Sequence, residues 1–350
     1  MTTSDPVLNE VTSPTAAFKL TVGSLEATQQ DPKGVDSIVV ETNLDMIGIC
    51  KIQIHGESIK PSDFKVGDDV TFEMGRNEIK TFQGNITSVK HNTKAGKEHI
   101  AIVAMDPLVK MSNSHQTQTW GGSTTDKVKD SDLASKVISD SGCSAGTVDS
   151  TTGERPYILQ RAESNLAFLK RLAARNGYLV YAEEGKIHFK KPQFSEAPIE
   201  ISSGDLIDTD VQRTDLQIPK KVIVHGWDYV RKTEITGECD TSAIDKIGSG
   251  ALPDPQTYGD DLHISDVFVD SDASAKAMAE GEMNRLARGL VRGTITVNGN
   301  GKLIPGKKVK MVGNWSSFNA EVLIAGARHV IEPGSVAQTT VWVVGNTEPE

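Results

Sequence analysis

The segment from Gly301 to Lys308 comes closest in this sequence to a known chemical motif. It fits the start of the phosphate-binding loop GxxxxGK[ST] through Gly301, Gly306 and Lys307. The last position of that loop needs a hydroxyl that ligates magnesium, but here it is Lys308. The residues that follow alternate as in a strand, whereas a phosphate loop leads into a helix whose N-terminus holds the phosphate. We therefore expect no nucleotide binding here.

Metal, redox and nucleophilic chemistry need clustered side chains, and the usual clusters do not occur. Cys50, Cys143 and Cys239 lie far apart, without a CxxC pair or a neighbouring His. There is no GxSxG elbow and no HExxH motif, because the histidines are scattered over His55, His91, His99, His115, His188, His225, His263 and His329. Two carboxylates could meet in the fold as in a glycosidase, but no pair stands out. The sequence predicts no catalytic, metal or cofactor site.

Charge and hydropathy exclude nucleic acid and membrane as main partners. The formal net charge is −10, whereas nucleic-acid binding requires a basic face. The lysine pairs at 190–191, 220–221 and 307–308 are isolated and suit solvated strand ends. Residues 1–14 carry no apolar signal region, and no stretch approaches the roughly 18 apolar residues of a membrane span. With an odd number of cysteines, we expect synthesis and first assembly in the cytoplasm.

Short alternating segments follow a polar tail that we expect to be flexible over residues 1–15. Period-two alternation places one face of each strand in a core and the other in water. Gly, Asp and Asn punctuate the gaps, as hairpins require. We expect residues 16–112 to form a first β-barrel, with strands at Phe18–Val22, Ile38–Val40, Cys50–Ile54, Val70–Met74 and Ile100–Ala104.

Residues 113–200 change to an α/β pattern. A first helix is predicted over Lys129–Ser141, since Leu133, Val137 and Ile138 form one stripe before Gly142. A β-hairpin is predicted over residues 178–190, with its turn at Glu183-Glu184-Gly185.

A second helix in this region is predicted over residues 164–176. Its apolar face contains Leu166, Leu169 and Leu172, with Phe168 about 100° off that stripe, near its edge. Ser164 is placed to cap the start and Gly177 to end the helix. The cationic side chains are expected to point away from the core: Lys170, Arg171 and Arg175. We interpret this helix as a packing unit between two barrels.

Residues 201–345 return to strands, and we expect a second β-barrel there. The strands are predicted around Lys221–Val224, Ile295–Val297, Val309–Met311, Val322–Ile324 and Val341–Val343. The acidic stretch 236–266 is rich in Gly, Ser and Pro and predicts a long surface loop. A helix is expected over 272–289, from apolar residues at helical spacing. The tripeptide His225-Gly226-Trp227 is interpreted as a strand end with an anchoring Trp.

An internal echo links the two ends of the chain. Near the start the sequence reads FKVGDDVTF around Gly67, and near the end LIPGKKVKM around Gly306. His91 follows Gly67 by 24 positions, and His329 follows Gly306 by 23. Each segment has an apolar residue, Gly, two polar residues, Val, a polar residue and a large apolar side chain. Two related barrels would produce this echo; chance similarity of short β-motifs is the alternative.

Residues 157–189 resemble the signature of the phage late control D family. The run YILQRAESNLAFLKRLA over 157–173 is followed by Gly177-Tyr178 and by GKIHF at 185–189. The matching positions are an aromatic residue and a Gln, a Ser cap, a Phe-Leu-x-Arg-Leu helix and a Gly: Tyr157, Gln160, Ser164, Phe168, Leu169, Leu172 and Gly177. The family includes the baseplate hub of contractile-tailed phages and the hub part of VgrG spike proteins, and the similarity covers roughly residues 16–345.

This sequence departs from the family at two places. Family members often have a more acidic segment after the leucine-rich helix, where this chain has Ala173-Ala174-Arg175-Asn176. VgrG proteins also continue into an OB-fold and a β-helical needle, whereas this sequence ends at Glu350. We therefore expect a hub alone, with the spike on another polypeptide.

The resemblance implies a structural function without catalysis or cofactor. A homotrimer whose copies each hold two barrels would present six barrels to a six-fold tail tube and three-fold symmetry to a spike. The implied partners are the tail tube protein, the spike protein and other baseplate or wedge proteins. The sequence does not distinguish a phage from a bacteriocin or a cellular injection system.

Two other classes of function remain open. A tail-tip cell-wall hydrolase would be recognised by an assay on peptidoglycan. A trimeric carbohydrate-binding tail protein would favour clustered aromatic residues, but the 4 Trp and 5 Tyr are scattered singly.

Overall fold

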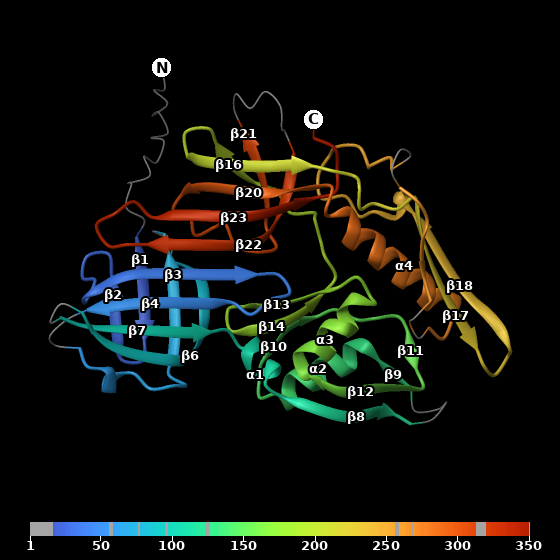
Figure 1. Cartoon of the computed structure of the whole chain (residues 1–350), viewed down its shortest axis with the longest axis horizontal. Helices are drawn as coiled ribbons and strands as arrows, with labels where there is room; N and C mark the ends of the chain where they lie inside the picture. Colours follow the sequence, from blue (N-terminus) through green and yellow to red (C-terminus); the bar gives the residue numbers. More distant parts are fainter. Residues whose placement is uncertain are drawn as a thin grey trace, which may run out of the picture.

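The chain folds into two β-rich units, a middle region with helices, and an outlying arm (Figure 1). The computed structural model describes residues 17–349 except 56–58, 76–77, 95–96, 123–126, 256–258, 266, 268 and 313–319. The tail expected over residues 1–15 lies outside the described residues. The predicted fold class, α+β and mainly β, is confirmed.

The first unit is a set of antiparallel strands wrapped around its own apolar core. Leu20, Ile52 and Phe72 have no exposed surface, and they come from the alternating positions that predicted the strands. The elements are β1 (Phe18–Val22), β2 (Leu25–Thr28), β3 (Val35–Asn43), β4 (Ile49–His55), the 3-10 turn η1 (Pro61–Asp63), β5 (Asp69–Met74), β6 (Ile79–Lys94) and β7 (Lys97–Met105).

The middle region packs three helices against small sheets around a second core. Strands β8 and β12 pair with each other, as do β9 and β11, while β10, β14 and β13 form a three-stranded sheet. The elements are α1 (Leu108–Ser112), β8 (His115–Gly121), β9 (Val128–Lys129), α2 (Asp130–Asp140), β10 (Ala145–Val148), β11 (Glu154–Arg155), β12 (Tyr157–Ser164), α3 (Asn165–Ala174), β13 (Leu179–Glu183) and β14 (Lys186–Lys190).

The second unit is interrupted by the arm. Its strands are β15 (Ile199–Ser202), β16 (Leu206–Arg213), β20 (Val291–Asn298), β21 (Lys308–Val312), β22 (Glu321–Ile331) and β23 (Gln338–Gly345). The arm lies between β16 and β20 in sequence, and its sheet β18-β17-β19 packs on the helix of the arm (Figure 1). It consists of β17 (Lys221–Asp228), β18 (Thr233–Asp240), η2 (Thr241–Ala243), β19 (Leu262–Ile264) and α4 (Asp272–Ala287).

The prediction of a long loop over 236–266 was wrong at both ends. Strand β18 continues to Asp240, and β19 pairs parallel with β17, with Ile223 opposite His263. Ile244 and Ile247 between them are buried. Glycine and acidic residues are rare in strands, so the part of β18 from Thr236 onward was predicted as loop. Gly237 is nevertheless needed there, because β18 crosses α4 and a Cβ at this position would lie 2.1 Å from the Lys276 backbone N.

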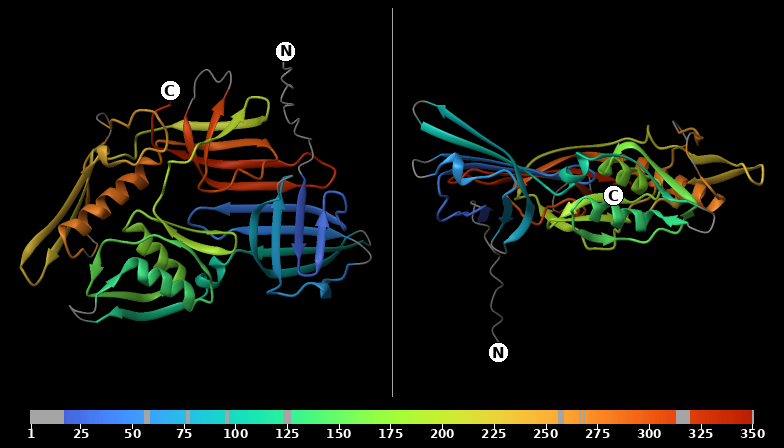
Figure 2. Two further views of the ribbon diagram at one scale, coloured as in Figure 1. Left: turned by 180° about the vertical axis from the view of Figure 1, so that it is seen from behind. Right: turned by 90° about the horizontal axis from the view of Figure 1, so that it is seen from below.

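The two units expected as separate barrels share one curved sheet. Strand β22 of the second unit pairs antiparallel with β3 of the first, with His329 opposite Val40 and Ile331 opposite Ile38. The sheet therefore runs without a break in the order β16-β20-β23-β22-β3-β4-β7-β6-β5-β1-β2. Figure 2 shows the two units side by side from behind, with the middle region and the arm at the other end.

Candidate functional site

The two glycine turns found in the sequence have the same hydrogen-bond pattern. Gly67 N donates to Ile86 O at 2.8 Å, and Ile86 N donates back to Asp68 O at 2.9 Å. In the second unit Gly306 N donates to Ile324 O at 2.9 Å, and Ile324 N donates to Lys307 O at 2.9 Å. Both glycines have a left-handed backbone, with φ of 99° and 87°, which other residues adopt at a cost.

The correspondence continues along the long strands β6 and β22. The pairing of β6 with β7 shifts between Ile86 and Ser88, and that of β22 with β23 shifts between Ile324 and Gly326. Each shift therefore begins at the residue that closes the glycine turn. The strand order β5-β6-β7-β4-β3 has its counterpart in β21-β22-β23-β20-β16. The chain thus contains the same five-stranded arrangement twice.

The units differ at one edge. Strand β1 runs antiparallel to β5, whereas β15 runs parallel to β21. The arm is inserted only in the second unit, between β16 and β20. The repeat is therefore complete in its five central strands and not beyond them.

Equivalent histidines have opposite environments. His91 and His329 lie the same number of residues after Ile86 and Ile324, but the His91 side chain is 40% exposed while His329 is 1% exposed. His329 Nδ1 lies 3.0 Å from Thr339 Oγ1, and its Nε2 has no partner among the described groups. Burial lowers the pKa of His329 to about 4. Strand β3 pairs with the edge of β22 at this point, whereas no described strand pairs with the equivalent edge of β6 beyond Asn85.

The signature residues of the middle region hold the start of α3. Ser164 Oγ accepts from Ala167 N at 3.1 Å, which caps the helix. The fully buried Gln160 donates to Asn165 Oδ1 at 2.9 Å, and Asn165 Nδ2 donates to Ser141 Oγ at 3.0 Å. This network joins β12, α3 and the end of α2, so Gln160 has a structural role that sequence spacing could not reveal.

The apolar face of α3 is wider than predicted. Leu169, Leu172 and Phe168 have no exposed surface, and Leu166 is 7% exposed. Phe168 was expected near the edge of the stripe, but it stacks on Trp120 of β8 with ring centroids 6.4 Å apart. The helix packs against α2 and α1 as well as against the expected hairpin strand β13.

Arg175 does not point away from the core as expected. Its side chain is 11% exposed, and its guanidinium makes a two-pronged ion pair with the buried Asp130 at the start of α2. Desolvation lowers the pKa of Arg175, and the hydrogen bond that Arg175 donates to Asp130 opposes that shift. Asn176 also donates to Asp130 at 2.7 Å. The partner lies 45 positions away in sequence, which is why local periodicity missed it.

Two glycines bring the arm against the middle region. Gly177 lies three residues after the end of α3 and has a φ of 67°, and a Cβ there would lie 2.9 Å from Gly281 Cα in α4. A side chain at either position would push the two elements apart. Tyr157 differs from the other signature residues because it is 53% exposed.

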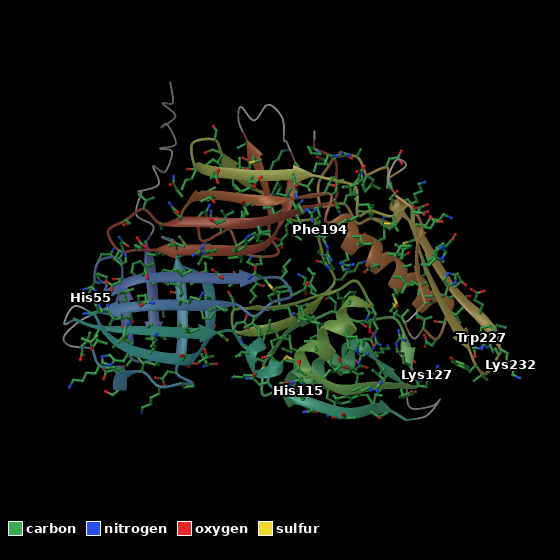
Figure 3. All side chains as sticks on the ribbon, in the orientation of Figure 1. His55, His115, Lys127, Phe194, Trp227 and Lys232 are labelled. Carbon is green, nitrogen blue, oxygen red and sulfur yellow. The ribbon has the colours of Figure 1, made fainter. Side chains whose placement is uncertain are left out.

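The described residues contain no group of three or more His, Cys, Asp or Glu side chains that could hold a metal ion. Cys50 and Cys239 are buried, and burial raises the pKa of the Cys239 thiol to about 11. Lys308 of the phosphate-loop-like segment begins β21 and pairs with Glu321 at 3.1 Å. Trp227, expected as an anchor, is 48% exposed near the tip of the β17–β18 hairpin (Figure 3).

The whole chain has the fold of known tail proteins. It superposes on a 43 kDa tail protein of prophage MuSo2 from Shewanella oneidensis with a TM-score of 0.71 and 15% identity, covering 95% of this chain and 99% of that one. A tail protein from Neisseria meningitidis MC58 gives 0.70 and 13%, covering 95% and 97%. An Escherichia coli type VI secretion component, described as similar to T4 bacteriophage tail proteins gp27 and gp5, gives 0.61 and 16%, covering 94% and 77%.

The sequence assigns the chain to a family as well. Residues 14–333 match the family model described as Alg8 N-terminal domain, so the chain belongs to that family. None of the curated proteins matches the chain in sequence. In the part of the chain that the structure describes, no helix is long and apolar enough to cross a membrane.

Proposed function

We propose that this protein is a structural baseplate hub of the late control D type, in a contractile phage tail or a contractile injection system. As a homotrimer it joins the six-fold inner tube to the three-fold spike. The similarity of the whole fold to tail proteins supports the general class. One observation supports the specific proposal: β3 pairs with β22, but the two equivalent strands, β16 and β6, do not pair with each other within a single chain.

The open counterpart lies on β6. Strand β22 pairs with β21 along its first half and with β3 along its second half. Strand β6 likewise pairs with β5 along its first half, but no described strand follows on that edge beyond Asn85. His91 and Asn92 are therefore exposed, whereas the corresponding end of β22 is covered. An open edge presents unpaired backbone donors and acceptors to another chain.

The strand that fits this edge is β16. It occupies the place in the second unit that β3 has in the first: β3 pairs with β4, and β16 pairs with β20. Its outer edge ends the sheet, and most of its side chains are exposed. We infer that β16 of one copy pairs with β6 of the next, as β3 pairs with β22 within a copy.

The repeat also gives the register of this contact. Arg328 lies opposite Glu41 and forms an ion pair with it at 3.3 Å. The equivalent positions are Lys90 in β6 and Gln212 in β16. Repetition of one junction within and between copies generates a closed ring when six units complete one full turn. Three copies then contribute six equivalent units, which match a six-fold tube protein while retaining three-fold symmetry for a spike and for other baseplate or wedge proteins.

A disulfide test addresses the contact directly. In the doubly substituted protein Lys90→Cys/Gln212→Cys, oxidation should link neighbouring copies, because directly opposite Cα atoms in antiparallel strands lie about 4.5–5.5 Å apart, within disulfide range. With both cysteines on every copy, non-reducing electrophoresis should show a covalent trimer as the largest product. The protein should be oxidised alone and with its spike, since the ring can require that template.

The matched control is Lys90→Cys/Val211→Cys. A shift of one residue turns the second side chain to the opposite face of the sheet, so linkage should be weak. Equal linkage in both variants would contradict the proposed ring. So would a series of cross-linked bands that ends at the dimer or that continues to tetramers and hexamers. We further infer that the chain acts without turnover or cofactor, as a scaffold for its partners.

A further inference from the structure

A notch on the middle region combines arginines with exposed apolar side chains. It has a volume of about 220 Å³ and is lined by Arg155, Tyr157, Ile158, Leu159, Arg171 and Arg175. All the charged side chains that line it are arginines. Arg171 and Arg175 are paired with Glu163 and Asp130, and the formal net charge of the whole chain is −10. The notch would attract a negatively charged group.

Two of these arginines are held in place by carboxylates of the chain itself. Arg175 is fixed by the buried Asp130 through its Nε and Nη2 atoms. Arg171 uses the same two atoms for Glu163, with Nη2 to Oε1 at 2.5 Å, and Nη2 also donates to Leu159 O at 2.8 Å. In each described ion pair the Nη1 donors remain outside the contact. The ion pairs hold the guanidinium groups of Arg171 and Arg175 in place, so these side chains lose little conformational entropy when a carboxylate binds.

Two of the three apolar or aromatic residues that line the notch point away from the core. Along β12, Ile158 and Gln160 face the core, while Tyr157 and Leu159 alternate outward and are 53% and 40% exposed. Tyrosine and arginine are among the residue types most enriched at the energetic centres of protein interfaces. The exposed Tyr157 is part of the sequence signature, yet it does not contribute to the core that the other signature residues build.

We propose that this notch binds an acidic segment of a partner polypeptide, with a carboxylate beside the arginines and an apolar neighbour against Tyr157 and Leu159. A peptide fits better than a free phosphate, because the carboxylates of Asp130 and Glu163 already offset part of the positive charge and half of the lining residues are apolar or aromatic. Because Arg171 already donates a hydrogen bond to the backbone carbonyl of Leu159, we expect the peptide to contact side chains and not this carbonyl. Binding at the notch does not require a particular number of copies in the hub.

The test uses the full chain and two fluorescein-labelled 12-residue peptides that alternate apolar residues with either Glu or Gln. Fluorescence anisotropy should show the Glu peptide binding at least about tenfold more tightly than the Gln peptide, which corresponds to one charge-assisted contact. Raising the salt concentration should weaken the Glu peptide selectively. Arg171→Gln and Tyr157→Ala should each weaken its binding by about tenfold. Both side chains are substantially exposed, so a thermal melt should show these variants folded.

Arg231→Gln is the control, since Arg231 lies on the arm and its side chain is 83% exposed. It should leave peptide binding within about twofold of the original, since an exposed charge outside the contact contributes little. Failure of the Glu peptide to bind, equal binding of both peptides, or unchanged binding in the two notch variants would overturn the proposal. Displacement of the peptide by inorganic phosphate at equal concentration would indicate a small-anion site instead. A change in oligomeric mass in the notch variants would indicate a contact between copies, which also overturns it.

Discussion

His91 and His329 are equivalent residues, and the difference in their burial indicates where a neighbouring chain can bind. They occupy equivalent places in β6 and β22, but only His329 is covered by a further strand. A buried histidine with one unpaired ring nitrogen is costly to protonate. An exposed counterpart at the same place is explained if a neighbouring copy covers it in the assembly.

The environment of His329 predicts a dependence of stability on pH. Its pKa in the folded chain, about 4, lies below the ordinary value of 6.5, so the unfolded chain binds the proton first. The contribution of His329 is complete above about pH 6.5 and is lost as the pH falls toward 4. Between pH 7.5 and pH 5 the free energy of unfolding should therefore fall by an amount on the order of 1–2 kcal/mol through this group.

Chemical denaturation of the original chain and of His329→Gln at both pH values measures this effect. The variant should be less stable at pH 7.5 but should lose less stability on acidification. His91→Gln is the matched control, because His91 lies exposed at the equivalent position of β6. An identical pH dependence in the original chain and in His329→Gln would show that His329 is not the titrating group.

For single residues, the sequence predicted the positions of turns better than the burial of charged side chains. The spacing of Gly67 and Gly306 identified the two turns because a left-handed backbone strongly favours glycine. The outward direction expected for Arg175 was wrong, because its partner Asp130 belongs to another helix. Burial of charged side chains depends on partners remote in the chain, which local periodicity does not report.

Helix α3 is the element that organises the middle region. Its cap, the leucine stripe of its apolar face and the glycine that follows it were all visible in the sequence. Its contacts with α1, α2 and β8 were not, because each involves residues brought together by the fold. The helix therefore serves as a packing element for the region that carries the arginine notch.

Leu169→Ala tests this structural role. Leu169 has no exposed surface and lies in the core of the middle region, so its truncation should lower the free energy of unfolding by about 2–5 kcal/mol through lost burial and a cavity. Lys170→Gln, on the partly exposed side of the same helix, should cost no more than about half a kcal/mol. Thermal melts compare the two variants. A larger loss for Lys170→Gln than for Leu169→Ala would mean that the faces of the helix are reversed.

Among the elements, the sequence predicted the long periodic ones best. Helices α2, α3 and α4 lie within a few residues of their predicted bounds, since a stripe of apolar residues repeats several times in each. Strand β19 was missed because three residues in an acidic, glycine-rich stretch give no measurable alternation. Its place depends on the parallel pairing with β17, which is a property of the folded arm.

For the whole molecule, the duplicated unit is the feature that connects sequence, fold and proposed assembly. The echo in the sequence indicated two related units, but not that β3 and β22 join them in one sheet. That pairing connects residues nearly three hundred positions apart, and backbone hydrogen bonds carry no signature in side-chain sequence. The same junction, left open between β6 and β16, is the basis for the proposed ring.

An electron cryo-microscopy reconstruction of the protein bound to its tube and spike tests this account most directly. We expect three copies of the chain, six equivalent five-stranded units facing six tube subunits, and continuous pairing of β16 with β6 of the next copy. Lys90 should lie opposite Gln212 at each of the three contacts between copies. A different number of copies, or a β6 edge that faces solvent in the assembled particle, would contradict the central claim.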